Sequence, residues 1–508
     1  MKYLNSINSI QSQSEPNILL LYPPNQSWPT TMCKPNGSLA YPSLGGALCE
    51  AGIRVSLFDA CVGNQDDNLG DFFYNPTELP TGLLRTGVTN DRILEFVQDF
   101  DVIGLTSIFS DQETMVLSTC RLIKETYPKK ILISGGVNAR HRIKKFLSSG
   151  FDFVLLSEAE RPLVSLINEL FSVNNDFGSI SSIAFQKDGK TIINKTCHDD
   201  VVWDLDELPL PAWDLLPNEQ YWKIGRPHGG HFKKGEQLKY ASIMTSLGCP
   251  FSCSYCHIAG EKTDSISENI GKFRIKSDKR VQTELHLLRD EIGIKQVFIE
   301  DDSIFGQKKR AIRLLKRILN CGLEILDVNG VNIIHLLDKG KPDTEVIELL
   351  ARVGFREIVL PFESAYQGII DRYASRKWII EKADIKGLIK TCKEFGLKTP
   401  GNFMIGFPDE TRSEIFNTID FARKCMEWGL DSANFFLTMP LPGTPLFDYC
   451  VEEGYLDSDY DPDKMNWTKA NMKNTLVPPN ELEEIRENAW IELNAPDFVT
   501  FKKGMRPL

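Results

Sequence analysis

The sequence lacks the features of a membrane or secreted protein. No run in its 508 residues approaches the roughly 18 consecutive apolar residues that cross a bilayer. The first segment, MKYLNSINSIQSQSEP, has neither an apolar stretch nor a cleavage site. Its 12 cysteines are too sparse for a disulfide scaffold, so most thiols are expected to be free. We therefore expect a cytoplasmic protein.

Positive charge is also scarce. Lys and Arg number 58 against 69 Asp and Glu, which gives a net charge of -11. Nucleic acids and anionic membrane surfaces are bound by clustered cations, so neither is an expected partner. The 42% hydrophobic content is that of an ordinary globular protein, and the length fits roughly two to four domains.

Short apolar runs alternate with helical periods in residues 17–199, after a loose tail at 1–16. The runs are NILLLYPP, IRVSLFD, DVIGLTS, KKILISGG and FDFVLLSE. Runs buried on both faces that alternate with helices indicate a parallel sheet covered by helices. We predict an α/β domain, Rossmann- or flavodoxin-like, whose ligand site lies at the carboxyl ends of its strands.

This domain lacks the glycine-rich loop of a dinucleotide site. NILLLYPPNQ has no glycine after the first strand, and Gly45-Gly46 lie inside a predicted helix. Dinucleotide binding is therefore not expected. Residues 200–238, rich in Trp and Pro and then polar, are predicted to be a linker packed on the surface between the two domains.

A second alternation begins at residue 239. Six strand-like runs are separated by helical stretches: YASIMTS, QVFIEDD, EILDVNG, EIVLPFES, GNFMIGF and SANFFLTM. Six such units make a partial TIM-type (β/α)6 barrel over 239–454, with chemistry expected at the C-terminal strand ends. A small helical segment is predicted over 455–508.

The first barrel strand leads into SLGCPFSCSYCHIAG, where Cys249, Cys253 and Cys256 have the spacing C-x3-C-x2-C. Three thiolates on a tight loop can bind three corners of a cubane iron–sulfur cluster and leave one iron open. A structural zinc site needs four ligands, and only His257 is nearby. A C-x-x-C-H haem attachment needs an exported protein. These two readings are less favoured.

With this loop the sequence resembles the radical S-adenosylmethionine (SAM) enzymes. The resemblance implies a 4Fe-4S cluster on Cys249, Cys253 and Cys256, with SAM on the open iron. It implies SAM contacts from an aromatic residue before the third cysteine and from later strand ends: Tyr255, Asp301, Asp302, Glu363, Ser364, Ile405, Gly406, Phe407 and Pro408.

The N-terminal domain resembles the cobalamin-binding domain that precedes many radical SAM barrels. The matching pieces are LLLYPP, YPSLGGALCEAG, DVIGLTS, ISGGVNAR and SEAE. Ser157 and Ala159 stand where that family usually has the glycines of G-E-G-E. None of the seven histidines follows the D-x-H-x-x-G pattern that supplies a lower cobalt ligand elsewhere. The implied cobalamin contacts are Pro42, Ser43, Leu44, Ser107, Ile108, Phe109, Gly135, Gly136, Val137, Ser157 and Glu158.

The combined resemblance implies a cobalamin-dependent (class B) radical SAM methyltransferase, most like those of natural-product pathways. Such an enzyme takes one electron from a flavodoxin- or ferredoxin-type reductant and cleaves SAM to a 5′-deoxyadenosyl radical. It then transfers a methyl group from methylcobalamin to an unactivated centre of a small molecule. The cofactors perform this chemistry, which fits the absence of an acid–base motif.

Two alternatives stay open. The same architecture hosts cyclases and ring-rearranging enzymes without net methylation, and a non-catalytic cobalamin or redox sensor would keep the cluster. The sequence does not name the substrate. His228 and His231 in RPHGGHF either reach the site or lie on a surface loop.

Overall fold

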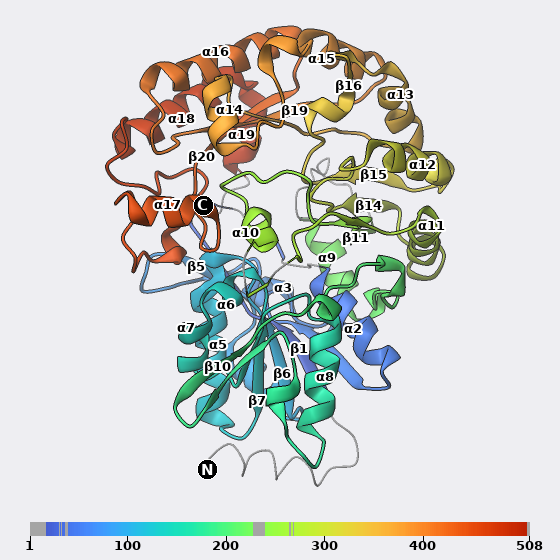
Figure 1. The fold of residues 1–508 in the computed structure, drawn as a ribbon, viewed down its shortest axis with the longest axis vertical. Helices are drawn as coiled ribbons and strands as arrows, with labels where there is room; N and C mark the ends of the chain where they lie inside the picture. The colour runs from blue at the N-terminus through green and yellow to red at the C-terminus, as the bar shows by residue number, and fades with distance from the viewer. Residues whose placement is uncertain are drawn as a thin grey trace. The chain divides into compact units, whose positions relative to one another are not determined.

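The structure, a computed structural model, describes residues 17–29, 31, 33–35, 39–226, 239–263, 266–267 and 269–504. The predicted tail and both His228 and His231 lie outside the described residues. The chain forms two compact units (Figure 1). The first comprises Met1–Gln237, Glu261–Ile270 and Arg506–Leu508, and the second comprises Leu238–Gly260 and Gly271–Met505.

A seven-stranded sheet of order β10-β9-β8-β7-β6-β1-β3 forms the centre of the first unit. Five of its strands are parallel, and β9 and β10 add an antiparallel hairpin at the β8 edge. When the five parallel strands are numbered in chain order, their spatial order across the sheet is 2-1-3-4-5, which is the flavodoxin-like order. The bounds are β1 Asn17–Tyr22, β3 Arg54–Asp59, β6 Val102–Thr106, β7 Ile131–Gly135, β8 Phe153–Leu155, β9 Ile183–Lys187 and β10 Lys190–Asn194.

Amphipathic helices cover this sheet, because each presents an apolar stripe to strands that are buried on both faces. Helix α8, for example, buries Leu163, Leu166, Ile167 and Leu170. A small separate sheet has the order β2-β5-β4. The bounds are β2 Asn25–Ser27, α2 Ala40–Glu50, α3 Leu69–Phe72, β4 Thr77–Glu78, β5 Leu84–Thr86, α4 Asn90–Val97, α5 Glu113–Thr126, α6 Val137–His141, α7 Ile143–Ser148, α8 Glu160–Leu170 and α9 Asn218–Ile224.

The described part of the predicted linker, residues 200–226, packs within the first unit. The Gln220 amide donates to three backbone carbonyls between residues 62 and 67 at 2.7–3.2 Å. A Cβ on Gly46 would lie 2.3 Å from the Leu210 carbonyl oxygen. Gly46 therefore lets the backbone near Leu210 approach α2 closely. This close packing, and not phosphate binding, accounts for the glycine in this helix.

Six parallel strands in two three-stranded groups form the second unit, β11-β14-β15 and β18-β19-β20. A parallel bridge between Ile325 and Phe355 extends the first group toward the second. All six predicted runs form these strands, so the predicted partial barrel is confirmed. The bounds are β11 Tyr240–Ile243, β14 Gln296–Ile299, β15 Glu324–Asp327, β18 Leu360–Glu363, β19 Pro400–Ile405 and β20 Ser432–Leu437.

Helices follow the barrel strands, and α18 of the C-terminal segment packs on the last strand. Arg486 of α18 donates to the Phe435 carbonyl at 2.9 Å, and the Asn494 amide pairs with the backbone of Ala433. In the described part of the chain, no helix is both long and apolar enough to span a bilayer. The bounds are α10 His257–Thr263, α11 Asp278–Leu287, α12 Lys308–Ile318, α13 Thr344–Val353, α14 Gln367–Tyr373, α15 Ile385–Glu394, α16 Arg412–Trp428, α17 Pro445–Glu452, α18 Pro479–Leu493 and α19 Pro496–Gly504.

Candidate active site

The cysteine loop begins at a glycine that no other residue could replace without strain. Gly248 has φ of +72°, and a Cβ there would lie within 2.6 Å of the Gly271 and Lys272 carbonyl oxygens. The left-handed conformation turns the chain from the short strand β12, Ser246–Leu247, into the loop. Cys249 then donates its N–H to the Gly271 carbonyl at 3.4 Å.

Backbone hydrogen bonds hold the loop on both sides of Cys253. The Ser254 N–H donates to the Tyr373 carbonyl at 2.8 Å, and the Ser252 N–H donates to Ser375 Oγ at 3.0 Å. Within the loop, the Cys256 N–H donates to the Cys253 carbonyl at 3.0 Å. The turn after α14 therefore fixes the central cysteine.

The three thiols fit an iron–sulfur cluster better than a single ion. Burial raises the pKa of Cys256, and Asp302 with the other two thiols adds to the rise, so metal binding must displace its proton. Among the described residues, no three His, Cys, Asp or Glu side chains converge as one metal ion would require. A cubane takes each thiolate on a different iron, so its three sulfurs need not converge.

Three aromatic rings, among them that of the predicted residue Tyr255, pack together at the loop. The Tyr255 and Phe407 ring centroids are 6.2 Å apart, and Tyr373 stacks on Phe407 at 4.7 Å. All three are within the second unit and come from the loop, the end of α14 and the turn after β19. Flat apolar faces of this kind suit a purine ring.

The turn after β19 is held by a carboxylate that sequence reasoning did not single out. Glu410 Oε2 accepts the N–H of Gly406 at 2.6 Å and that of Phe407 at 3.1 Å. Burial raises the pKa of Glu410 to about 8. Ile405 and Pro408 are buried on either side of this turn. Glu410 is the last residue of the GFPDE segment, so this motif could have indicated that Glu410 supports the turn.

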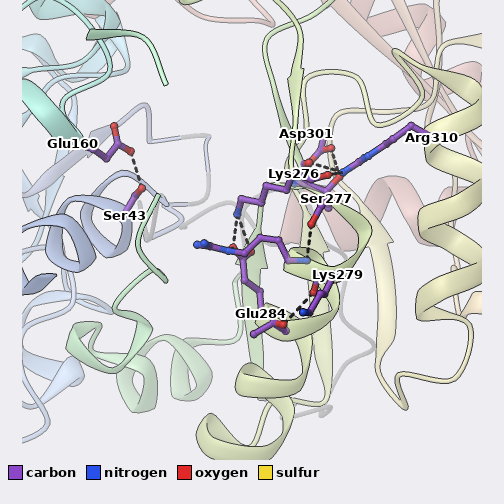
Figure 2. Close-up of polar contacts among 11 residues, drawn as sticks. Ser43, Glu160, Lys276, Ser277, Lys279, Glu284, Asp301 and Arg310 are labelled. Carbon is purple, nitrogen blue, oxygen red and sulfur yellow. Dashed lines mark hydrogen bonds and ion pairs between the residues drawn. The ribbon is translucent and has the colours of Figure 1, made fainter. Parts of the chain in front are cut away.

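Asp301 and Asp302 have different surroundings. Asp301 is buried and accepts hydrogen bonds from Thr245 N at 2.5 Å, Thr245 Oγ1 at 2.6 Å and Ser246 Oγ at 2.6 Å (Figure 2). Buried Arg310 donates to the same Thr245 hydroxyl at 3.0 Å. Asp301 thus joins the ends of β14 and β11. Asp302 is partly exposed.

Glu363 and Ser364, at the end of β18, are both engaged with protein groups. Glu363 has φ of +61° and forms an ion pair with Lys377. Ser364 Oγ lies 3.2 Å from Thr418 Oγ1 and accepts the Tyr366 N–H at 3.1 Å. Sequence reasoning missed Lys377, because nothing local in ASRKW predicts an inward side chain.

In the first unit, the predicted residues of α2 lie where its first turns meet the sheet. Ser43 Oγ donates to Glu160 Oε1 of α8 at 2.7 Å (Figure 2). Leu44 packs against the apolar core, and the Pro42 carbonyl accepts the Ala212 N–H at 2.8 Å. Preceding them, the Tyr41 hydroxyl bridges β1 and β6 through Leu21 O at 2.6 Å and Thr106 N at 2.7 Å.

The carboxyl ends of β6 and β7 approach each other closely. Gly136 has φ of +99°, and a Cβ there would lie 2.6 Å from the Ser107 carbonyl oxygen. A Cβ on Gly135 would meet only Leu155 at 3.5 Å. Ile108 is partly exposed and Phe109 is 40% exposed, while Val137 begins α6.

Two buried polar atoms at these strand ends have no hydrogen-bond partner among the described residues. They are Ser157 Oγ, after β8, and Asn138 Oδ1, after β7. The Asn138 amide also donates to Ser107 Oγ at 3.0 Å. Glu158 is partly exposed beside them. Unpaired buried polar atoms, an exposed aromatic and a glycine at which a Cβ would meet only ordinary contact fit a polar, flat ligand such as cobalamin.

Comparison with known proteins identifies the class. Residues 243–422 match the radical SAM superfamily, so this part of the chain is a radical SAM domain. It is 28% identical to an uncharacterized methyltransferase, PH0819, of Pyrococcus horikoshii, over 82% of each chain. It is 26% identical to the cytidylyl-2-hydroxyethylphosphonate methyltransferase of Streptomyces wedmorensis, over 77% of this chain and 75% of that protein.

Two further comparisons concern the fold and the alternative that the chain is a cyclase. The structure resembles the radical SAM methyltransferase TsrM of Kitasatospora setae, solved with cobalamin and a 4Fe-4S cluster bound. The TM-score is 0.63 at 16% identity, over 93% of this chain and 85% of that one. The predicted pairing of a cobalamin-type domain with a radical SAM barrel is thereby confirmed as a fold. The anaerobic magnesium-protoporphyrin IX monomethyl ester cyclase of Cereibacter sphaeroides is 24% identical over 78% of this chain and 60% of that protein.

Proposed function

We propose that the chain is a cobalamin-dependent radical SAM methyltransferase acting on a small molecule. One observation carries the proposal: a single chain joins the three-cysteine loop of a partial barrel to a flavodoxin-like sheet with unpaired polar atoms at its strand ends. The similarity to two proteins named as methyltransferases supports it.

In this proposal each unit binds its own cofactors. Cys249, Cys253 and Cys256 hold the cluster, and SAM lies against Tyr255, Asp302 and residues 405–408. Asp301 and Ser364 position the walls of this site, since their side chains are already engaged. The bound groups supply electron transfer, SAM cleavage and the methyl group, while the chain orients them and excludes water.

Cobalamin is proposed to lie across the strand ends of the first unit, near the predicted residues 42–44, 107–109, 135–137 and 157–158. A natural-product substrate, a flavodoxin- or ferredoxin-type reductant and a cytoplasmic location complete the proposal. The phosphonate named in the Streptomyces wedmorensis protein supports the substrate class.

Anaerobic turnover with SAM labelled in its methyl group tests the function. A labelled product together with 5′-deoxyadenosine supports a methyltransferase. The cyclase similarity keeps a second candidate, for which 5′-deoxyadenosine would form without label in the product. Protein that binds cobalamin but gives neither product would contradict both and leave a sensor.

A further inference from the structure

Lys377 is a buried cation in the segment that holds the cysteine loop. Its side chain is 10% exposed, as is that of its ion-pair partner Glu363. It follows two residues in the left-handed conformation, Ser375 with φ of +55° and Arg376 with φ of +52°. Non-glycine residues adopt this conformation only when the surrounding structure imposes it.

The surroundings of this turn are well defined. The Arg376 N–H donates to the Ile370 carbonyl at 3.1 Å, and the Lys377 N–H donates to the Ala374 carbonyl at 3.2 Å. The Trp378 indole then donates to the Phe362 carbonyl in β18 at 3.1 Å. The chain is thus folded back so that the Lys377 side chain reaches Glu363 at the end of β18.

The same turn holds the cluster loop. The Tyr373 carbonyl and Ser375 Oγ accept the N–H groups that flank Cys253. Burial alone would lower the pKa of Lys377, but Glu363, Cys253 and Cys249 together raise it, so these groups favour an ammonium ion. Two of the three cluster thiols therefore lie within its electrostatic reach.

We propose that Lys377 tunes the iron–sulfur cluster: its ammonium group raises the reduction potential, while Glu363 lowers that potential and holds Lys377 in place. The proposal rests on the radical SAM part of the proposed function. When the cluster gains one electron from the external reductant, its net charge becomes more negative by one. A nearby cation stabilises that state more than the oxidised one. Lys377 acts through the cluster, so it is a positioning residue.

Burial makes this effect substantial. Exposed charges are screened by salt and water, whereas a buried pair retains its field. The two partners of the ion pair, Lys377 and Glu363, carry opposite charges, and each charge can be removed by its own substitution. Loss of Lys377 and loss of Glu363 should shift the potential in opposite directions.

The test uses full-length protein reconstituted anaerobically with iron and sulfide, without SAM, and a redox titration followed by electron paramagnetic resonance. We expect a more negative potential for K377Q, a wild-type potential for K377R and a less negative one for E363Q. K124Q, which breaks a partly buried ion pair with Asp152 in the first unit, is the control and should leave the potential unchanged.

A purely structural ion pair would shift K377Q and E363Q in the same direction, and that result would overturn the proposal. So would an unchanged potential in K377Q accompanied by weaker SAM binding, since the lysine would then serve SAM. If K377Q takes up no iron, the reduction potential of E363Q becomes the test. A potential more negative than that of the wild type in E363Q would then overturn the proposal. Wild-type protein without a cluster would instead contradict the proposed function.

Discussion

The carboxylate of Glu410 and the backbone N–H of Gly406 lie 2.6 Å apart, four residues along the chain. Gly406 has φ of +78°, and the same carboxylate accepts the Phe407 N–H. One buried side chain therefore supports the turn proposed to meet the adenine of SAM.

Replacing Glu410 should weaken SAM binding in a graded way. E410A removes the acceptor of two buried N–H groups, and each buried group left unpaired costs about 1–3 kcal/mol. We expect a loss of SAM affinity of about tenfold or more for E410A and a smaller loss for E410Q, whose amide oxygen still accepts. Equilibrium binding of SAM to the reconstituted protein measures this. Equal losses in the two variants would contradict it.

Cys253 is expected to be essential for the cluster. C253A should abolish cluster iron and all 5′-deoxyadenosine formation, because each remaining thiolate can hold only one iron. Iron and sulfide analysis and chromatography of the products measure both. C49A, which changes an exposed cysteine outside the loop, is the control. Retained SAM cleavage in C253A would refute the assignment of this loop.

Gly135, the last residue of β7, and Gly136, which follows it, should separate stability from cofactor binding. G136A places a Cβ 2.6 Å from Ser107 O at a positive φ, so thermal stability should fall by about 1–3 kcal/mol. G135A meets only ordinary contact, so it should keep its stability and lose bound cobalamin. Thermal unfolding and the visible spectrum after loading measure the two effects. A G135A variant that retains cobalamin fully would argue against close approach of the ligand there.

Asp327 at the end of β15 should make stability pH-dependent. Burial raises its pKa to about 8, with Asp301 adding to the rise and a backbone hydrogen bond from Gly330 opposing it. The native state therefore binds this proton more tightly than the unfolded chain does. Its contribution to stability is full below about pH 4 and is lost as the pH rises toward 8.

D327N should remove that dependence, because an amide does not ionise. Melting temperatures of wild type and D327N at pH 5.5, 7 and 8.5 measure the difference, which should grow in favour of D327N as the pH rises. D99N, at an exposed position, should track the wild type. A constant difference between D327N and wild type would contradict the burial argument.

No histidine of the chain should coordinate cobalt through a D-x-H-x-x-G motif, since none follows that pattern. Electron paramagnetic resonance of the reduced, cobalamin-loaded protein should therefore be unchanged when each histidine is replaced singly. His141, on α6 after β7, is the first to replace because it follows a predicted cobalamin segment. A variant that loses nitrogen coupling would reveal a histidine ligand.

The strands were predictable because apolar runs and their spacing are local signals. The six barrel runs and the five parallel strands of the first unit all form as expected. The packing of residues 200–226 was not predictable, since it depends on contacts such as Gln220 with residues 62–67, over 150 positions away. Composition predicted a segment packed on the surface but not the residues that it contacts.

The site was predictable to the level of strand ends but not of side-chain partners. The motif around Asp301 could not show that Thr245 and Ser246 occupy its oxygens. Gly136 was expected to admit a ligand, whereas its closest neighbour is a carbonyl of the protein. Lys377 depends on the conformation of two preceding residues, which no motif encodes.

Residues Glu261–Ile270 belong to the first unit although the residues on both sides of them in the sequence belong to the second. This affects how the chain can be divided. A gene cut at residue 238 would give an N-terminal fragment that lacks part of its own unit, because the ten residues Glu261–Ile270 are encoded in the other fragment. Swapping either half with that of a related enzyme would require exchanging this decapeptide as well. Recombination between such genes should therefore be constrained at this stretch.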